Sequence, residues 1–255
     1  MAGTVRLYTL TCENTDEVKI WKTTSGCIIY KVLGGRSNSY LLLSDNVAVL
    51  VDTGKESSYQ KLVKNIEGLD FTQKSQRVLV LSHSHFDHCQ NACELACSFG
   101  FKIFVGSAED SCVRQGYTPL PQGTGFFTRF LVSVGNRYLS SGFGYKPFAP
   151  DFLVNDEVVL FESNPSIRLL TTPGHSPGSI SIVVDDEIAL VGDTLFGVFP
   201  NTVFPPYTDD PLLLVNSWTK LLHTNCKIFL PGHGRPISRS LLLSEYQKRC
   251  GSSDF

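Results

Sequence analysis

The densest group of metal-binding side chains in the chain is the segment HSHFDH, in which His83, His85, Asp87 and His88 are potential ligands. The segment follows the apolar run RVLVL and precedes a helical pattern, so we expect it on a loop at a strand end. Such a loop can turn His83 and His85 toward one point and Asp87 and His88 toward another. Imidazole and carboxylate suit zinc, iron and manganese, and no C-x-x-C pair lies nearby to close a structural zinc site. The pattern therefore predicts an open, catalytic metal site rather than a solvated polar turn.

Three further segments each place one potential ligand after an apolar strand pattern. They are LLTTPGHSPGS with His175, IALVGDTLF with Asp193 and IFLPGHGRP with His233. Each ligand has a glycine beside it, and glycine permits the sharp turns and close backbone approach that a crowded cluster needs. We expect these residues to join the first four at one edge of the fold. The sixth histidine, His223, follows a predicted helix, where it can meet the C-terminal carbonyls, so we assign it no metal-binding role.

The elements that must position these residues are short strands that alternate loosely with helices. Apolar runs of strand length occur at 5–10, 27–33, 40–43, 47–51, 78–81, 102–105, 158–161, 167–171, 180–184, 188–191 and 227–230. Helical patterns occur at about 57–67, 90–98, 108–115, 125–139, 211–222 and 238–248. The fifth helix has Asp210 at its N-cap and Pro211 at its first position. The order predicts a layered α/β or α+β architecture in a single domain over 1–255.

The most irregular stretch, 116–150, is rich in glycine, proline and aromatic residues. It joins the half that bears the first cluster to the half that bears His175, so we expect it to form a lid over the metal edge. An apolar wall beside a few polar groups suits a small-molecule pocket. Phe126, Phe127 and Phe130 lie at helical spacing within it, and the alternative is an outer helix whose phenylalanines pack on the sheet.

The composition is that of an ordinary globular protein. A formal charge of −2, with 18% charged and 42% hydrophobic residues, gives no electrostatic reason to expect nucleic acid or a membrane as a partner. The N-terminus has no signal-peptide pattern, and no apolar run approaches the ~20 residues that a bilayer span needs. We therefore expect a soluble, cytoplasmic protein that acts on a small molecule, and the oligomeric state stays open.

The cysteines are scattered and include no C-x-x-C pair, so we expect free thiols in a reducing compartment. Cys89, Cys93 and Cys97 recur every four residues, as they would on one face of a helix. Free cysteine is among the most buried residue types. We therefore expect these three to be buried core thiols rather than metal ligands.

Taken together, these motifs resemble the metallo-β-lactamase superfamily, and the resemblance covers most of the chain. Five motifs match in order: Asp52 in VLVDTG, the cluster at 83–88, then His175, Asp193 and His233. The spacing also fits, with 87 residues from His88 to His175, 18 from there to Asp193 and 40 more to His233. The resemblance implies a four-layer αββα sandwich, in which two mixed sheets lie face to face with helices outside and the metals at one edge.

The resemblance also implies a role for each ligand. His83, His85 and His175 would hold the first metal, Asp87, His88 and His233 the second, and Asp193 would bridge both. Asp52 would stand behind the ligands and orient one of the histidines. The alternative for Asp52 is an ordinary turn aspartate before Gly54.

Two divalent ions about 3.5 to 4 Å apart, most simply Zn²⁺ with iron or manganese as alternatives, can supply a metal-bound hydroxide at neutral pH. Asp87 is then the candidate proton carrier for the leaving group. The resulting prediction is a metal-dependent hydrolase of a small ester, thioester or lactone. Phosphodiester hydrolysis, as in a nuclease, is less expected, because the larger insertion of the nucleic-acid-processing members is absent and the charge balance offers no phosphate-tracking surface.

The segment GDTLFG resembles the glyoxalase II and persulfide dioxygenase branch, which favours a thiol-derived substrate. The chain departs from that branch at GVFPNTVFPPYTDDP and ends 22 residues after His233, so we do not expect glutathione specificity. An alternative function is a mononuclear iron dioxygenase of a thiol or persulfide, with His83, His175 and Asp193 as the facial triad. A metal-binding scaffold without activity is the remaining class. Substrate and native metal stay open.

Overall fold

The computed structural model describes residues 7–10, 18–124, 140–162 and 164–250, and it contains two β-sheets. The first sheet has eight strands in chain order, antiparallel from β1 to β5 and parallel from β5 to β8. These strands are β1 (Leu7–Leu10), β2 (Val18–Lys22), β3 (Ile28–Leu33), β4 (Ser39–Leu43), β5 (Val47–Val51), β6 (Gln76–Val80), β7 (Lys102–Gly106) and β8 (Phe152–Val154).

The second sheet has six strands in the order β14-β13-β12-β11-β10-β9, and all its pairs are antiparallel except β12 with β13. Its strands are β9 (Val158–Phe161), β10 (Ile167–Thr171), β11 (Ile180–Val184), β12 (Ile188–Gly192), β13 (Ile228–Pro231) and β14 (Ile237–Ser238). Both sheets are thus mixed, as the sequence predicted.

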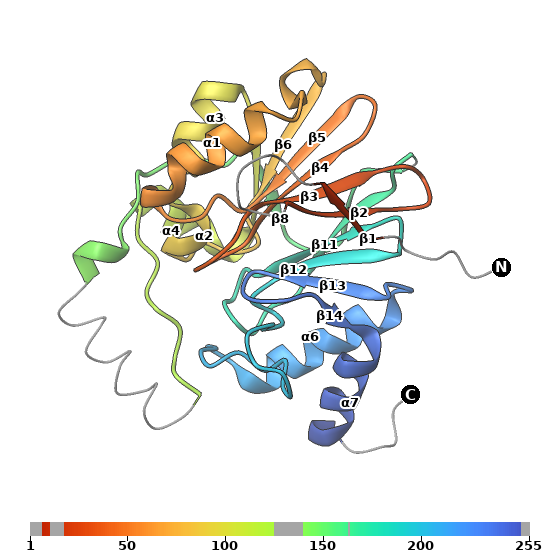
Figure 1. Cartoon of the computed structure of the whole chain (residues 1–255). Coiled ribbons are helices and arrows are strands. Elements are labelled where there is room, and N and C mark those ends of the chain that lie inside the picture. The colour runs from red at the N-terminus through yellow and green to blue at the C-terminus, as the bar shows by residue number, and fades with distance from the viewer. Residues whose placement is uncertain (1–6, 11–17, 125–139, 163, 251–255) are drawn as a thin grey trace.

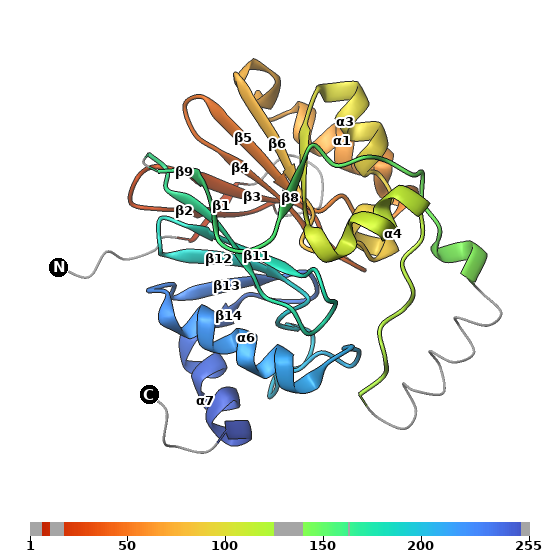
Figure 2. The same ribbon diagram turned by 180° about the vertical axis from the view of Figure 1, so that it is seen from behind.

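Helices cover the outer face of each sheet (Figures 1 and 2). On the first sheet lie α1 (Tyr59–Glu67), α2 (Phe86–Cys89), α3 (Ala92–Phe99) and α4 (Asp110–Gln115), and on the second α6 (Pro211–His223) and α7 (Arg239–Cys250). Short 3₁₀ turns occupy Glu56–Ser58, Phe71–Gln73, Ser107–Glu109 and Ser140–Phe143. The predicted four-layer αββα sandwich is therefore confirmed.

Alternation along the strands produces the layers. In β5, Val47, Val49 and Val51 point into the core between the two sheets, whereas Ala48 and Leu50 point into the core under α1 and α3. Successive strand residues face opposite sides, so a wholly apolar strand can serve two cores at once. A third core lies between the second sheet and helices α6 and α7, around Trp218 and Leu242.

Most predicted elements form, and the differences have local causes. Asp210 caps α6, because its side chain accepts hydrogen bonds from the amides of Leu212 and Leu213, with Pro211 at the first position. Strands β2, β8 and β14 were not predicted; β2 carries two lysines among its five residues, and β8 and β14 are only three and two residues long. The predicted helix at 125–139, with Phe126, Phe127 and Phe130, lies outside the described residues.

The expectation for the three cysteines was right only for Cys89, which is buried, whereas Cys93 is half-buried and Cys97 exposed. The cause is a break in the helix. Cys89 ends α2, and Cys93 and Cys97 belong to α3, which begins at Ala92. Residues four apart also advance by about 40° around a helix, so such a row turns gradually toward solvent. No helix among the described residues is long and apolar enough to cross a membrane.

Candidate metal centre

The first cluster lies where β6 ends and α2 begins, at the edge of the sandwich. His85 has extended backbone before the helix, and Asp87 and His88 fall in the short helix itself. His83, His85 and His88 are at most 4% exposed. This change from strand to helix within four residues turns consecutive side chains to different sides of one point. The sequence predicted a loop for all four residues, whereas Asp87 and His88 lie in α2, which begins four residues before the predicted helix.

The other three residues follow β10, β12 and β13 of the second sheet, and they meet the first cluster at the same edge. A glycine makes this approach possible at Gly232, where an added Cβ would lie 2.4 Å from Asp193 Oδ1 and 2.7 Å from His88 Cε1. At Gly192, which has a φ of +48°, an added Cβ would lie 2.5 Å from the Ser82 side chain. The two sheets can therefore bring their ligand loops together only with glycine at these positions.

The structure brings all seven predicted side chains into one cluster. Ligand atoms lie within 4.8 Å of one another in three groups: His83 with His85 and His175, His83 with His88 and Asp193, and Asp87 with His88 and His233. Asp193 lies between them, with Oδ2 3.6 Å from His175 Nε2 and 3.2 Å from His233 Nε2, and Oδ1 3.6 Å from His88 Nε2. Asp193 thus approaches histidines from all three groups.

Three of the histidines in the cluster have one ring nitrogen turned outward to a backbone partner. His175 Nδ1 lies 2.9 Å from the carbonyl of Tyr207, and His233 Nδ1 donates to the carbonyl of Arg36. The His85 ring bonds to the backbone of Pro119, and its Nδ1 lies 3.0 Å from His175 Nε2. A hydrogen on the outer nitrogen leaves a lone pair on the inner one, which is the tautomer a metal ligand needs.

Asp52 orients the remaining two histidines. Its Oδ2 lies 2.9 Å from His88 Nδ1 and accepts a bond of 2.7 Å from the Ser82 hydroxyl, which in turn lies 3.0 Å from His83 Nδ1. Asp52 Oδ1 accepts from the Ser82 amide at 2.7 Å, and its backbone has a left-handed φ of 59°. Asp52 thus contacts one cluster histidine directly and reaches a second through Ser82.

Two buried atoms of the cluster have no hydrogen-bond partner among the described residues, His83 Nε2 and Asp193 Oδ1. Such atoms are rare in folded proteins, because an unpaired buried polar group costs about 1–3 kcal/mol. Both belong to the group formed by His83, His88 and Asp193. A bound cation would satisfy both, so the donor set fits divalent metal ions.

The electrostatics of the cluster also favour cations. Burial, opposed by the charge of nearby carboxylates, lowers the pKa of His85 and of His175 to about 4, so both imidazoles are neutral at pH 7. Burial would lower the pKa of His88 as well, but Asp193 and Asp52 raise it to about 10. Burial would raise the pKa of Asp193, yet His233 and His88 hold it well below its usual range. The carboxylates around His88 stabilise a positive charge beside them, which either a proton or a metal ion supplies.

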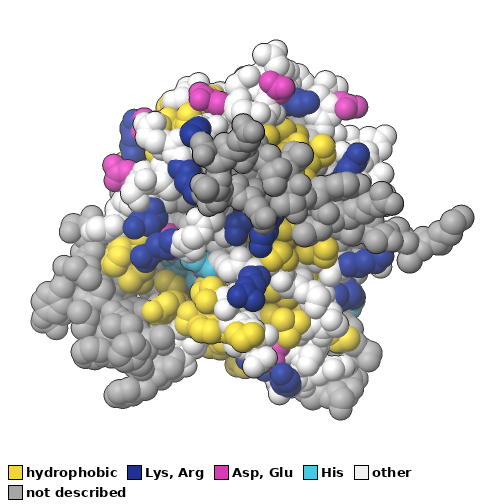
Figure 3. Space-filling model, viewed as in Figure 1, with side chains coloured by type: hydrophobic (Ala, Val, Ile, Leu, Met, Phe, Trp, Pro, Cys, Tyr) yellow, Lys and Arg dark blue, Asp and Glu magenta, His cyan; other side chains and the backbone are white. Residues whose placement is uncertain are grey.

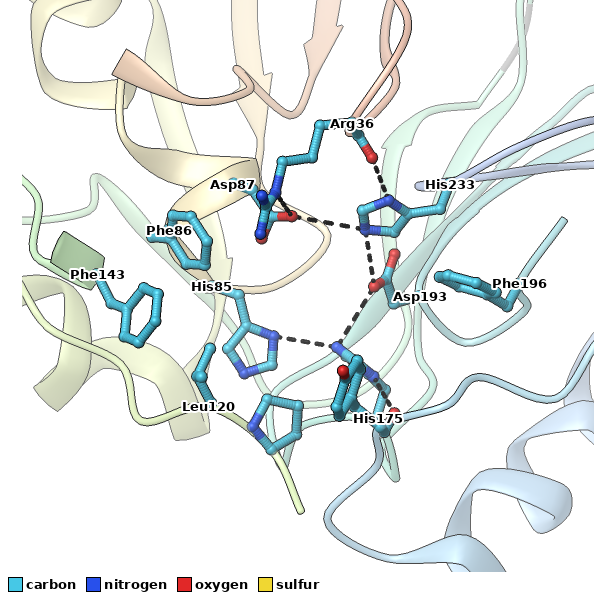
Figure 4. A pocket seen from close by; sticks show the side chains of 12 residues that line it. Arg36, His85, Phe86, Asp87, Leu120, Phe143, His175, Asp193, Phe196 and His233 are labelled. Carbon is cyan, nitrogen blue, oxygen red and sulfur yellow. Dashed lines mark hydrogen bonds and ion pairs between the residues drawn. The ribbon is translucent and has the colours of Figure 1, made fainter. Parts of the chain in front are cut away.

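A cavity of about 350 Å³ opens over the cluster (Figure 4). His85, Asp87, His175, Asp193 and His233 form its polar floor, and the histidines are visible at the base of a hollow in the surface (Figure 3). Three residues of its walls, Leu120, Pro121 and Phe143, belong to the predicted lid segment 116–150. Sequence reasoning did not assign the other four to the site: Arg36, Phe86, Phe196 and Tyr207. Of these four, only Arg36 had a usable signal, because GGRSNSY follows a predicted strand as the ligand motifs do.

The model of the Metallo-beta-lactamase superfamily matches residues 32–233, and the chain belongs to this family. It is a metallo-hydrolase of that superfamily. Among curated proteins, the chain is similar to the hydroxyacylglutathione hydrolase GloC of Haemophilus influenzae, with 30% identity over 211 residues that cover 81% of this chain and 89% of the relative. It also resembles the probable metallo-hydrolase YqgX of Bacillus subtilis, with 26% identity over 63% of this chain and 67% of the relative.

Solved structures share the fold at lower identity. The archaeal superfamily protein ST1585 from Sulfolobus tokodaii has a TM-score of 0.63 and 20% identity, covering 89% of this chain and 88% of that protein. The subclass B3 metallo-β-lactamase BJP-1 of Bradyrhizobium japonicum has a TM-score of 0.64 and 18% identity, covering 86% and 87%. These likenesses concern the fold alone.

Proposed function

We propose that the chain is a dinuclear metal-dependent hydrolase, most simply a zinc enzyme, that cleaves a small ester, thioester or lactone in the cytoplasm. His83, His85 and His175 would hold one ion, Asp87, His88 and His233 the other, and Asp193 both. When bound, a pair of divalent ions supplies an acidified water and polarises the substrate carbonyl. The observation that carries the proposal is the cluster of seven candidate ligands, Asp193 among them, with two buried atoms unpaired within it.

The residues around the ions would divide the remaining work. Asp87 lines the cavity with its side chain 14% exposed, so it can carry a proton between the cluster and the leaving group. Phe86, Leu120 and Phe143 form an apolar wall on one side, suited to an acyl chain or a thiol substituent. The similarity to a hydroxyacylglutathione hydrolase supports a thioester as the first substrate to test.

Arg36 would give the pocket its preference for an anionic substrate. It is the one lysine or arginine among the described residues that line the cavity, and its guanidinium lies 5.4 Å from the centre of the Phe86 ring. Its Nε is 3.7 Å from Asp87 Oδ2, beyond hydrogen-bond distance, and the side chain is 62% exposed. A guanidinium at the mouth of an apolar pocket can bind a carboxylate of the substrate through two parallel bonds.

Metal analysis and a substrate panel test this proposal. We expect protein purified without added metal to hold close to two zinc ions per chain and to hydrolyse thioesters faster than phosphodiesters. One iron per chain, with oxygen consumed on a persulfide, would instead support the dioxygenase. The cluster argues for the dinuclear enzyme because a mononuclear triad would leave Asp87, His88 and His233 facing one another without a function.

A further inference from the structure

A buried glutamate outside the metal cluster, Glu109, lies between two of the ligand loops. It is 2% exposed and follows β7, at the end of the 3₁₀ turn Ser107–Glu109. Its Oε1 accepts hydrogen bonds from the Ser176 hydroxyl at 2.6 Å and the Gly178 amide at 2.9 Å, and its Oε2 accepts from the Ser84 hydroxyl. One carboxylate thus binds donors from two segments far apart in the chain.

Those donors belong to the loops that carry His83, His85 and His175, which form one of the possible ligand groups. Ser84 stands between His83 and His85 after β6 of the first sheet, and Ser176 follows His175 after β10 of the second sheet. His85 and His175 must meet across the boundary between the sheets, where their ring nitrogens lie 3.0 Å apart. The relative position of the two loops therefore decides whether this group can hold an ion.

Two glycines, Gly106 and Gly178, leave the space that Glu109 needs to reach both loops. An added Cβ on Gly178 would lie 2.4 Å from Glu109 Cγ, and one on Gly106 would lie 1.9 Å from the Gly178 carbonyl oxygen. The Ser84 hydroxyl also contacts Thr118 Oγ1 at 2.8 Å, so the network continues away from the metals. Glu109 belongs to none of the possible ligand groups among the described residues and does not line the cavity.

We propose that Glu109 is a positioning residue that sets the spacing of the His83–His85 loop and the His175 loop for the first metal ion. The inference rests on the proposed metal function. Ligand bonds to zinc from nitrogen are about 2.0 to 2.1 Å long and tolerate little displacement, so loss of the carboxylate weakens the ion held by these three histidines. The group formed by Asp87, His88 and His233 has no hydrogen bond to Glu109, so the ion proposed there stays bound.

The test compares Zn²⁺ binding, by chelator competition, in wild type, Glu109→Ala and a control, Glu245→Ala. Glu245 is also 2% exposed, but it lies in α7, paired with Lys248 at 2.7 Å and Arg249 at 3.1 Å. We expect Glu109→Ala to weaken one of two zinc equivalents by about 10- to 100-fold, as loss of a residue behind a metal ligand commonly does. Glu245→Ala lowers the melting temperature and leaves both equivalents unchanged.

Glu109→Gln separates charge from hydrogen bonding. Its amide oxygen can keep the bonds from Ser176 and Gly178, and its NH₂ can donate to Ser84, whose hydroxyl then turns to Thr118. We therefore expect this variant to bind both zinc ions nearly as wild type does. Should Glu109→Ala not fold, the pair Ser84→Ala and Ser176→Ala removes two of the three donors and should reproduce the loss of one equivalent.

Two results would overturn the proposal. One is wild-type affinity for both zinc ions in folded Glu109→Ala or in the double serine variant. The other is equal weakening of both equivalents in proportion to the fall in melting temperature, which would make Glu109 a general stabiliser. Failure of the proposed function looks different, because wild-type protein would then bind no pair of zinc ions.

Discussion

At the scale of single residues, the two aspartates of the cluster have different surroundings. Asp193 is 7% exposed and approaches three histidines, as the proposed link between two metal ions requires. Asp87 faces the cavity, beside Arg36. Their substitutions should therefore separate metal binding from turnover.

We expect Asp193→Ala to abolish the paired site, because both ligand groups lose their shared carboxylate. Asp87→Asn keeps the first ion, since that group contains only histidines, but lowers kcat by about 100-fold or more through the lost proton path. Metal stoichiometry and steady-state kinetics on the same preparations measure both effects. Full activity in Asp87→Asn would refute its role as proton carrier.

Arg36 offers a test of substrate charge. Arg36→Met should reduce kcat/KM for a carboxylated thioester by about tenfold, roughly 1.4 kcal/mol, and spare its neutral methyl ester analogue. The His233 contact survives the substitution, because it uses the backbone carbonyl of Arg36. An equal loss on both substrates would show that Arg36 acts on the pocket as a whole and not on the anion.

At the scale of elements, the described ends of the 116–150 stretch reach the site. Leu120 and Pro121 before the gap and Phe143 after it line the cavity, and Phe143 packs on Phe86 with ring centres 4.9 Å apart. These contacts support the lid hypothesis for the flanks. Phe126 and Phe127 lie outside the described residues, so for them the lid stays a prediction.

Phe143→Ala should therefore change the relative kcat/KM among acyl chains of different length by about tenfold, since about 1–3 kcal/mol accompanies a methylene-sized difference in such a pocket. The same ratio is expected to shift in Phe126→Ala or Phe127→Ala if the lid covers the acyl group. Zinc content should stay at the wild-type value in all three. Unchanged selectivity with a large fall in melting temperature would assign these rings to the core.

Helix α7 carries a pH-sensitive contact of its own. Burial would raise the pKa of Glu245, but hydrogen bonds from Lys248 and Thr202 and the charge of Arg249 lower it to about 2. A carboxyl whose folded pKa lies below its unfolded value stabilises the fold above about pH 4.5 and loses that contribution as the pH falls toward 2. Glu245→Gln should lower the free energy of unfolding by about 2 kcal/mol at pH 7. The free energy of unfolding measured in urea should then depend less on pH between these two values than it does in wild type. The same pH dependence in the two proteins would contradict this.

At the scale of the whole molecule, the candidate metal centre joins the two sheets at one edge of the sandwich. Metal ions that bind only the folded state stabilise it by about 2.7 kcal/mol at a free concentration one hundred times Kd. Removing zinc with a chelator should thus lower the melting temperature, and zinc added back should restore it. Asp193→Ala is the matched control, and its melting temperature should respond less to the chelator than that of wild type, because it lacks the paired site.

The sequence by itself predicted the seven residues of the candidate metal centre and the family and, through the family resemblance, the layer order. Those features are local: ligand motifs at strand ends, apolar runs with strand period, and a cap such as Asp210 are each readable within a dozen residues. The sequence wrongly predicted that Cys93 and Cys97 are buried, because it gave no sign that the helix is interrupted before Ala92.

Only the tertiary structure decided which residues complete the site from a distance. Glu109 meets Ser176 across 67 positions of the chain, His85 meets His175 across 90, and the Arg36 carbonyl meets His233 across 197. A buried glutamate after a strand and an arginine after two glycines carry no local pattern that identifies their partners. Their roles arise because packing the two sheets face to face brings the strand ends of both to one edge, where loops distant in sequence exchange hydrogen bonds.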